Sequence, residues 1–252
     1  MDKTKIFAHR GASGYAPENT LEAFALAVSQ KADGIELDVQ LTRDGVPVVI
    51  HDETIDRVTS KTGYVKDYTL KELKKLTVME KRFPAYPSSK IPTLEEVLDA
   101  VKASGIWVNI ELKTGIYWYP EIEQKVAQIV QKCDMEQRVI YSSFNHYSIQ
   151  KIKQIVPEAE TAYLYSDVIW NVTDYAKNTK VDGIHPAVYH IKMADFLNEY
   201  IKSGLNVRVW TVNDTTDMKW LIEAGVTAVI TNYPDVAVKI REQRENQNHA
   251  GK

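Results

Sequence analysis

The chain has very little cysteine: Cys133 is the single thiol among 252 residues. One cysteine cannot form an intramolecular disulfide, so the fold does not depend on an oxidising compartment. Cys133 lies in a helical pattern, where a small structural residue is far more common than a catalytic thiol. The sequence therefore excludes a scaffold held by its own disulfides.

Long apolar segments are also missing. No uninterrupted apolar run approaches the ~18 residues that a membrane-spanning helix needs, and the first five residues lack the apolar stretch of a signal peptide. We therefore expect a cytoplasmic protein without stable insertion into a membrane.

A large excess of positive or negative charge is absent as well. The 31 Lys and Arg residues stand against 34 Asp and Glu residues, a formal net charge of −3, and no long basic run occurs. This balance disfavours nucleic acid as a partner. The 44% of hydrophobic residues suffices for a core, and the length suits one (β/α)8 barrel or two smaller domains. The sequence leaves the oligomeric state open.

Short apolar runs alternate with longer helical patterns along the chain, which predicts an α/β fold with a parallel sheet covered by helices. The candidate strands are 6–8, 34–39, 47–51, 106–112, 138–142, 161–164, 183–185, 206–210 and 228–231. The candidate helices are 20–30, 94–102, 121–132, 146–156, 194–203 and 216–224.

One strand is too many for an eight-stranded barrel, and the spacing identifies it. A short connection with the turn signal Arg43-Asp44-Gly45 joins the second and third strands. A parallel crossover needs about a dozen residues, so 37–41 and 46–51 are predicted to form an antiparallel hairpin. A turn centred near Asp44-Gly45 places His51 opposite Asp38. The other eight runs predict a TIM-type (β/α)8 barrel.

Two segments depart from the alternation of strands and helices. Residues 54–90 contain one short helical stretch and a loop rich in Pro and Ser, too short for much core of their own. We interpret them as a small insertion after the hairpin. Residues 241–252 are polar and are expected to fray. We therefore expect one barrel domain over residues 1–240, followed by a polar tail.

Titratable side chains gather at the C-terminal ends of the first strands, the face where TIM barrels carry their active sites. Strand residues two apart share a face, so these side chains are expected to converge at one rim. They are His9 and Arg10 on the first strand, Glu36 and Asp38 on the second, His51 on the hairpin, and Glu111 and Lys113 on the next barrel strand.

Three of these residues, Glu36, Asp38 and Glu111, form a set of hard oxygen ligands. Crowded together without a cation they would repel one another and raise at least one pKa. One divalent cation, Mg2+ or Ca2+, removes that conflict and suits oxygen ligands. The alternative is a set of ion pairs with Arg10 and Lys113.

The two histidines, His9 and His51, can transfer protons near neutral pH. A single histidine is often structural, but two beside a carboxylate cluster favour acid–base chemistry. Arg10 and Lys113 supply the fixed positive charge that a phosphate needs, although each alone is more often a salt-bridge partner.

The remaining candidates are weaker. Glu18 belongs to a helix start and could also touch the site. Trp210 either walls a substrate pocket or lies in the core, and the same choice is open for Phe144 and Tyr189. His185, followed by proline, indicates a position on the rim rather than a catalytic one.

These motifs together resemble the glycerophosphodiester phosphodiesterase family, in order and over nearly the whole chain. The matching elements are His9-Arg10-Gly11, Pro17-Glu18-Asn19-Thr20, Glu36-Leu37-Asp38-Val39, Asp44-Gly45, His51-Asp52, Glu111-Leu112-Lys113, Trp210-Thr211-Val212-Asn213 and Thr231-Asn232-Tyr233-Pro234-Asp235. The resemblance implies hydrolysis of glycerophosphodiesters, such as glycerophosphocholine and glycerophosphoethanolamine, to glycerol 3-phosphate and an alcohol. It also implies that the three carboxylates hold a divalent cation, the two histidines act as acid and base, and Arg10 and Lys113 contact phosphate.

Two other functions remain open on the same scaffold. A lysophospholipase D would need an apolar groove, to which 117–119 and 83–86 could contribute. A non-catalytic phosphate-binding barrel would be expected to lack a histidine or a carboxylate of the set, and this chain keeps them all.

Overall fold

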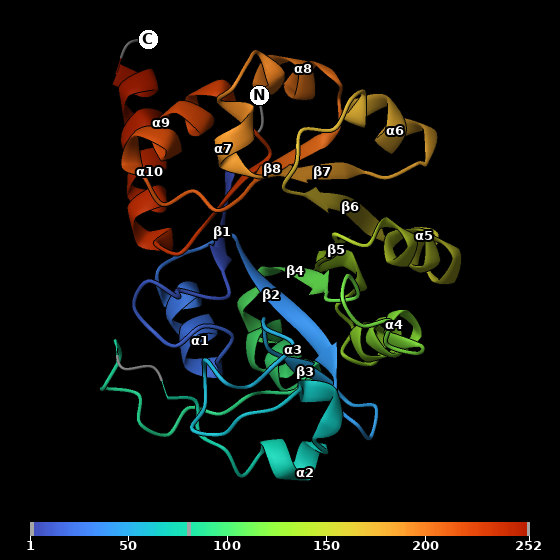
Figure 1. Ribbon diagram of the computed structural model, residues 1–252. Helices are drawn as coiled ribbons and strands as arrows, with labels where there is room; N and C mark the ends of the chain where they lie inside the picture. Colours follow the sequence, from blue (N-terminus) through green and yellow to red (C-terminus); the bar gives the residue numbers. More distant parts are fainter. Residues whose placement is uncertain (1–2, 80–81, 251–252) are drawn as a thin grey trace.

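The computed structural model describes residues 3–79 and 82–250 (Figure 1). Within them eight parallel strands close into a barrel, because β1 (Lys5–His9) pairs with both β2 (Gly34–Leu41) and β9 (Ala228–Thr231). The others, in order from β2, are β4 (Trp107–Leu112), β5 (Val139–Ser143), β6 (Glu160–Tyr165), β7 (Gly183–Pro186) and β8 (Asn206–Val209). The predicted TIM-type barrel is confirmed.

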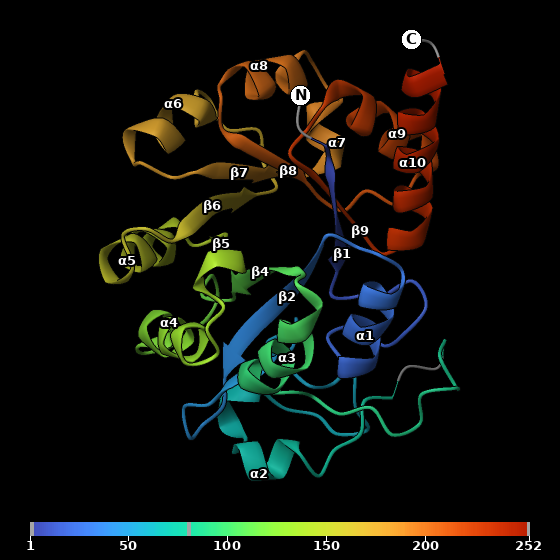
Figure 2. The same cartoon turned by 180° about the vertical axis from the view of Figure 1, so that it is seen from behind.

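Helices lie around the outside of the strands in both views (Figures 1 and 2). They are α1 (Leu21–Ser29), α3 (Leu94–Val101), α4 (Ile122–Lys132), α5 (His146–Ile155), α6 (Val172–Asn178), α7 (Val188–Ile191), α8 (Phe196–Lys202), α9 (Thr215–Ala224) and α10 (Pro234–Ala250), with the short turns η2 (Lys102–Ser104) and η3 (Glu136–Arg138). The sequence did not predict α6, because its seven residues are mostly polar and show no clear apolar period.

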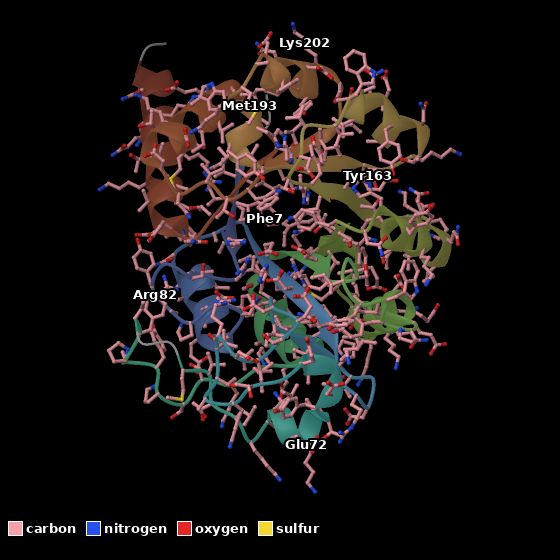
Figure 3. All side chains as sticks on the ribbon, in the orientation of Figure 1. Phe7, Glu72, Arg82, Tyr163, Met193 and Lys202 are labelled. Atoms are coloured by element: carbon pink, nitrogen blue, oxygen red, sulfur yellow. The ribbon has the colours of Figure 1, made fainter. Side chains whose placement is uncertain are left out.

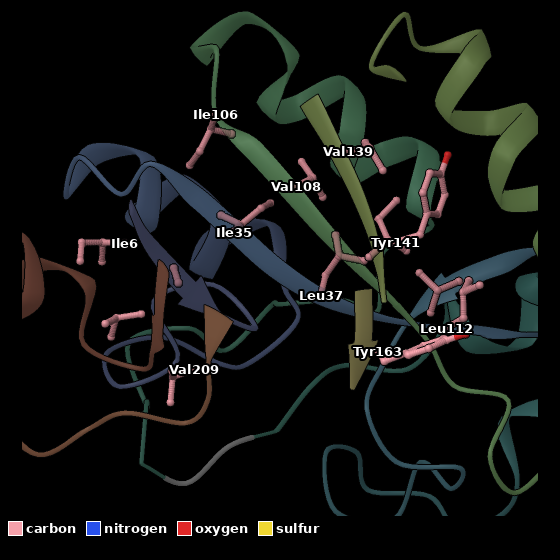
Figure 4. Packing of buried hydrophobic residues seen from close by; sticks show 14 of the residues in the cluster. Ile6, Ile35, Leu37, Ile106, Val108, Leu112, Val139, Tyr141, Tyr163 and Val209 are labelled. Carbon is pink, nitrogen blue, oxygen red and sulfur yellow. The ribbon is translucent and has the colours of Figure 1, made fainter. Parts of the chain in front are cut away.

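The barrel strands separate an apolar layer from a mixed interior. Outward-facing residues such as Ile35 and Leu37 pack in a large cluster between the strands and the helices (Figure 4). Inside the barrel, Phe7 forms a smaller apolar cluster with Ile140 and Ile230, near the centre of the molecule in Figure 3. Because side chains alternate along a strand, the inward positions nearer the C-terminal strand ends remain for polar residues.

The hairpin forms as predicted, with β3 (Pro47–Val49) antiparallel to β2, but its register differs by one residue. The backbone N–H of Ile50 donates to the Asp38 carbonyl at 3.0 Å, so Ile50 lies across from Asp38 and the prediction for His51 is wrong. The turn has three residues rather than two, with Gly45 in the left-handed region at φ 75°. A turn of three residues shifts the pairing by one position.

The segment between β3 and α3 contains two short helices, η1 (Val65–Asp67) and α2 (Leu70–Leu73), and lies at one end of the molecule in Figure 1. Its apolar side chains form a small cluster with the hairpin, made of Val48, Ile50, Ile55, Val58, Val65, Leu73, Val78 and Ile91. Sharing this core with the hairpin anchors the segment beside the barrel mouth.

The C-terminal segment differs from the expectation that residues 241–252 fray. Helix α10 continues to Ala250, and residues 251–252 lie outside the described part. Arg241 is 5% exposed, donates to the Thr4 carbonyl at 2.9 Å and forms an ion pair with Asp33. These long-range contacts hold the helix against the start of β1. None of the described helices has the length and apolarity to cross a membrane.

Candidate active site

Strand pairing brings the predicted residues together at the barrel mouth. His9 on β1 lies beside Glu36 on β2, and Asp38 lies beside Glu111 on β4. His51 reaches the same place from the end of the hairpin. The pocket at this mouth is lined by His9, Arg10, Glu36, His51, Asn109, Glu111, Phe144, Leu164, Trp210 and Ile230.

Glu36, Asp38 and Glu111 form a buried carboxylate cluster, with one oxygen of each within 4.8 Å of the others. Burial, and then the neighbouring carboxylates, raise the pKa of Glu36 well above its usual value. Burial also raises the pKa of Glu111. The same burial acts on Asp38, but the charge of Arg10 and smaller contributions outweigh it, so the pKa of Asp38 is lowered. Crowded acids with diverging pKa values form a site that is electrostatically strained.

Protein cations and donors satisfy only part of this cluster. Lys113 Nζ lies 2.9 Å from Glu111 Oε1 and 3.9 Å from Asp38 Oδ1. Arg10 Nε lies 3.4 Å from Asp38 Oδ2, to which Asn19 donates at 2.8 Å. Asp38 Oδ1 is buried and accepts no hydrogen bond from any residue that the structure describes. The expected ion pairs exist, yet buried carboxylate oxygens remain that fit a hard divalent cation.

His9 is oriented by Asn232, which directly follows the neighbouring strand β9. Its Nδ1 lies 2.8 Å from Asn232 Oδ1; an amide oxygen only accepts, so Nδ1 carries the proton and donates. The other nitrogen, Nε2, therefore has a free lone pair, 3.9 Å from Glu36 Oε2. Burial, and then the charge of Arg10, lower the pKa of His9 to about 4. The sequence places Asn232 in one of the matching motifs but did not predict its contact with His9, although its place directly after a strand that pairs with β1 was a usable signal.

His51 is held by its own strand end. Its Nδ1 lies 2.6 Å from Asp52 Oδ1 and donates to that carboxylate. Gln40, which is fully buried in β2, donates to the carbonyls of His51 and Asp52 at 2.9 and 2.6 Å. The Tyr119 hydroxyl donates to Gln40 Oε1 at 2.8 Å and fixes that amide. Backbone and ring of His51 are thus positioned separately.

Arg57, which the sequence did not single out, connects the two sides of the mouth. Its Nε donates to Asp52 Oδ2 at 2.7 Å, and its two terminal nitrogens donate to Glu18 at 2.9 and 2.7 Å. Glu18 also accepts from Arg10 at 3.1 Å. Burial opposes ionisation of Asp52, but the bonds from Arg57 and then His51 lower its pKa to about 2. Glu18 therefore contacts the pocket through Arg10, and it contacts Asp52, the partner of His51, through Arg57.

The comparisons with known proteins agree with this geometry. A sequence model of the glycerophosphoryl diester phosphodiesterase family matches residues 9–236. The chain belongs to this family. It is 42% identical over 238 residues to the glycerophosphodiester phosphodiesterase of Caldanaerobacter subterraneus subsp. tengcongensis, covering 94% of this chain and 98% of that one. It is 44% identical over 246 residues to that of Bacillus altitudinis, covering 95% and 99%.

Solved structures give the same result. A phosphodiesterase of Oleispira antarctica, in complex with its product sn-glycerol-3-phosphate, matches with a TM-score of 0.88 at 28% identity, over 95% of this chain and 97% of that one. A glycerophosphodiester phosphodiesterase of Agrobacterium tumefaciens matches with a TM-score of 0.79 at 30% identity, over 94% and 99%. The predicted enzyme class, a phosphoric diester hydrolase, is confirmed.

The aromatic part of the wall of this phosphodiesterase pocket comes from Phe144 and Trp210. Their rings meet edge to face at 5.5 Å, and Trp210 Nε1 donates to the His185 carbonyl at 2.7 Å. Both aromatic residues line the pocket, and Trp210 also packs against the small apolar cluster inside the barrel. Tyr189 is 54% exposed and is not among the described residues that line this pocket. His185 is fully buried beside Arg208, not on the rim as expected.

Proposed function

We propose that this chain hydrolyses small glycerophosphodiesters, such as glycerophosphocholine and glycerophosphoethanolamine, to glycerol 3-phosphate and an alcohol. The observation that carries the proposal is one pocket that is lined by Glu36 and Glu111 of the buried three-carboxylate cluster and by two separately oriented histidines. The sn-glycerol-3-phosphate product bound by the Oleispira antarctica relative supports this choice of product. Release of choline and glycerol 3-phosphate from glycerophosphocholine, with and without a chelator, tests it.

The charged residues divide into two groups by function. Glu36, Asp38 and Glu111 would hold one divalent cation, Mg2+ or Ca2+, which supplies a Lewis acid for a phosphate oxygen. Arg10 and Lys113 supply fixed positive charge to bind the phosphate and to stabilise the charge that builds up on it. The side chains of Arg10 and Lys113 already lie beside the carboxylates, at the same strand ends.

The hydrogen-bond partners of the two histidines suggest different roles. His9 is paired with a neutral amide and presents an unprotonated Nε2, so we assign it as the base that takes the proton of the nucleophile, either water or the glycerol 2-hydroxyl. His51 is paired with the carboxylate of Asp52, and such a partner stabilises a protonated ring. We therefore assign His51 as the acid that protonates the departing alcohol oxygen.

The arginine that joins Asp52 to Glu18 should position His51. Arg57→Met is expected to lower kcat about 10- to 100-fold, because a small misplacement of a catalytic group has effects of that size, with little change in KM. Arg43→Met is the matched control: this arginine is comparably exposed and pairs with Glu72 at 3.1 Å, outside the pocket lining. Equal kcat values for the two variants would contradict the positioning role.

Lysophospholipids are a second candidate substrate class, and one feature favours them. The chain after β4 to β7 exposes large apolar side chains: Ile116, Trp118, Phe144, Tyr147, Val168, Trp170, Tyr189 and Met193. Phe144 is 40% exposed and also lines the pocket, so this one apolar side chain reaches from the site to the surface. Of the expected groove residues 117–119, Tyr119 is buried and bonded to Gln40, whereas Trp118 reaches the surface.

We expect glycerophosphocholine to be the better substrate, with kcat/KM at least about 10-fold above that for lysophosphatidylcholine. An acyl chain on exposed loops stays partly in water, and leaving a lipid aggregate costs about 0.8 kcal/mol per CH2 group. Choline release from both substrates, below and above the micelle concentration, measures this. Faster release from the lysolipid, lost selectively in Trp118→Ser or Trp170→Ser, would instead establish the lysophospholipase D function.

A further inference from the structure

Asn109 is a buried amide without a partner. It lies in β4, is 0% exposed, and neither its Oδ1 nor its Nδ2 makes a hydrogen bond to any residue in the described ranges. Leaving a buried polar group unsatisfied costs about 1–3 kcal/mol, and native proteins contain few of them. Such a group in a pocket calls for a partner from outside the chain.

The amide faces the active site. Asn109 lines the pocket together with Glu36 and Glu111, and it is paired in register with Glu36. It lies two residues before Glu111 on the same face of β4. Asn109 and Glu36 are therefore further from the barrel mouth than Asp38 and Glu111, at the bottom of the pocket. Leu164 and Ile230 also line this pocket and offer no side-chain polar atoms.

We propose that Asn109 binds the hydroxyl groups of the glycerol moiety and thereby selects glycerol-containing diesters. This inference rests on the proposed function. Adjacent hydroxyls can accept from Nδ2 and donate to Oδ1, so they satisfy both amide atoms at once. Phosphate oxygens only accept and would leave Oδ1 facing negative charge. A quaternary ammonium offers neither a donor nor an acceptor, so the choline end of the substrate cannot form a hydrogen bond with either polar atom of the Asn109 side chain.

A substrate that lacks the hydroxyls should therefore be discriminated against. A site that hydrogen-bonds a hydroxyl rejects the analogue without it, because its own polar groups then stay buried and unpaired. The relevant pair is glycerophosphocholine and the methyl ester of phosphocholine, since both release choline and differ only in the retained alcohol. With water as the nucleophile, the ratio of their kcat/KM values measures how much hydrogen bonding to the glycerol hydroxyls contributes, whereas a methyl ester that is not cleaved at all would indicate attack by the glycerol 2-hydroxyl.

Asn109→Leu and Asn109→Ala are expected to lower that ratio about 10- to 100-fold, the effect of losing one or two buried hydrogen bonds. Ser142→Ala is the matched control. Ser142 is also 0% exposed with an unpartnered Oγ, and it lies beside Glu111 on β5, but it does not line the pocket. Its ratio should remain that of the wild type. An unchanged ratio in both Asn109 variants would overturn the proposal.

A binding measurement separates this inference from the proposed activity. Glycerol 3-phosphate should raise the Tm of the wild type more than methyl phosphate does, and the difference should vanish in Asn109→Leu. The leucine variant should itself be at least as stable without ligand, because it removes an unsatisfied buried amide. If the wild type cleaves glycerophosphocholine but prefers neither ligand, the inference fails alone. If it cleaves no glycerophosphodiester, the proposed function fails, and the Tm comparison still tests Asn109.

Discussion

Exhaustive chelation is expected to abolish turnover of glycerophosphocholine, and Mg2+ or Ca2+ is expected to restore it. The reason is the buried cluster of Glu36, Asp38 and Glu111, in which Asp38 Oδ1 has no hydrogen-bond donor among the described residues. Arg10 and Lys113 form ion pairs with Asp38 and Glu111 but leave this oxygen without a hydrogen bond. Full activity of a preparation that elemental analysis shows to be free of metal would refute the cation requirement.

The variant Glu36→Gln should separate cation binding from stability. Burial and the neighbouring carboxylates raise the pKa of Glu36, so neutralising it should raise the Tm of the chelated protein. The wild type should gain about 2.7 kcal/mol from cation at 100 times its Kd, and Glu36→Gln little or nothing. Glu123→Gln is the control, because Glu123 is equally buried but bonds to Ser148 and Lys151. It should lose stability and keep the cation response.

The central site residues were predictable because each depends on local spacing. Glu36 and Asp38 are two apart on one strand, and side-chain alternation places them on one face. Glu111 lies at the end of β4 and Lys113 directly follows that strand, again two residues on. The C-terminal ends of parallel barrel strands then meet at one rim. The position of His9 in the site could be predicted from its place at the end of the first strand alone.

The partners of these residues could not be predicted in the same way, because they depend on contacts between distant segments. Asn232 follows the last strand and reaches His9 only after the barrel has closed. Arg57 lies in a segment without periodic structure. The unpaired state of Asn109 is a property of the whole interior rather than of any motif.

Two errors have specific physical causes. The hairpin register depends on a single turn residue, since a three-residue turn and a two-residue turn fit the same Asp44-Gly45 signal. The polar C-terminal residues 241–252 were expected to fray, yet Arg241 is held by Thr4 and Asp33, far away in the sequence. Composition alone contains no information about the length of this turn or about the contacts of Arg241.

His9→Ala and His51→Ala are each expected to lower kcat about 100- to 10,000-fold on glycerophosphocholine, the usual effect of losing a positioned acid or base. Fold and cation affinity should remain, because the proposed ligands are the three carboxylates. His146→Ala is the control: this histidine stacks on Tyr163 at 3.9 Å, outside the pocket lining. A kcat near the wild-type value for either pocket variant would refute the two-histidine mechanism.

The double variant and an activated substrate then test how the two histidines divide the work. If both histidines serve one concerted step, as proposed, the double variant should lose much less activity than the product of the single losses. A nitrophenyl ester of glycerol phosphate has a leaving group that needs little protonation, so it should rescue His51→Ala and not His9→Ala. Asp52→Asn removes the carboxylate that orients His51, so it should be rescued by the same substrate. Rescue of His9→Ala instead would reverse the assignment, and rescue of neither would give at least one histidine a binding role.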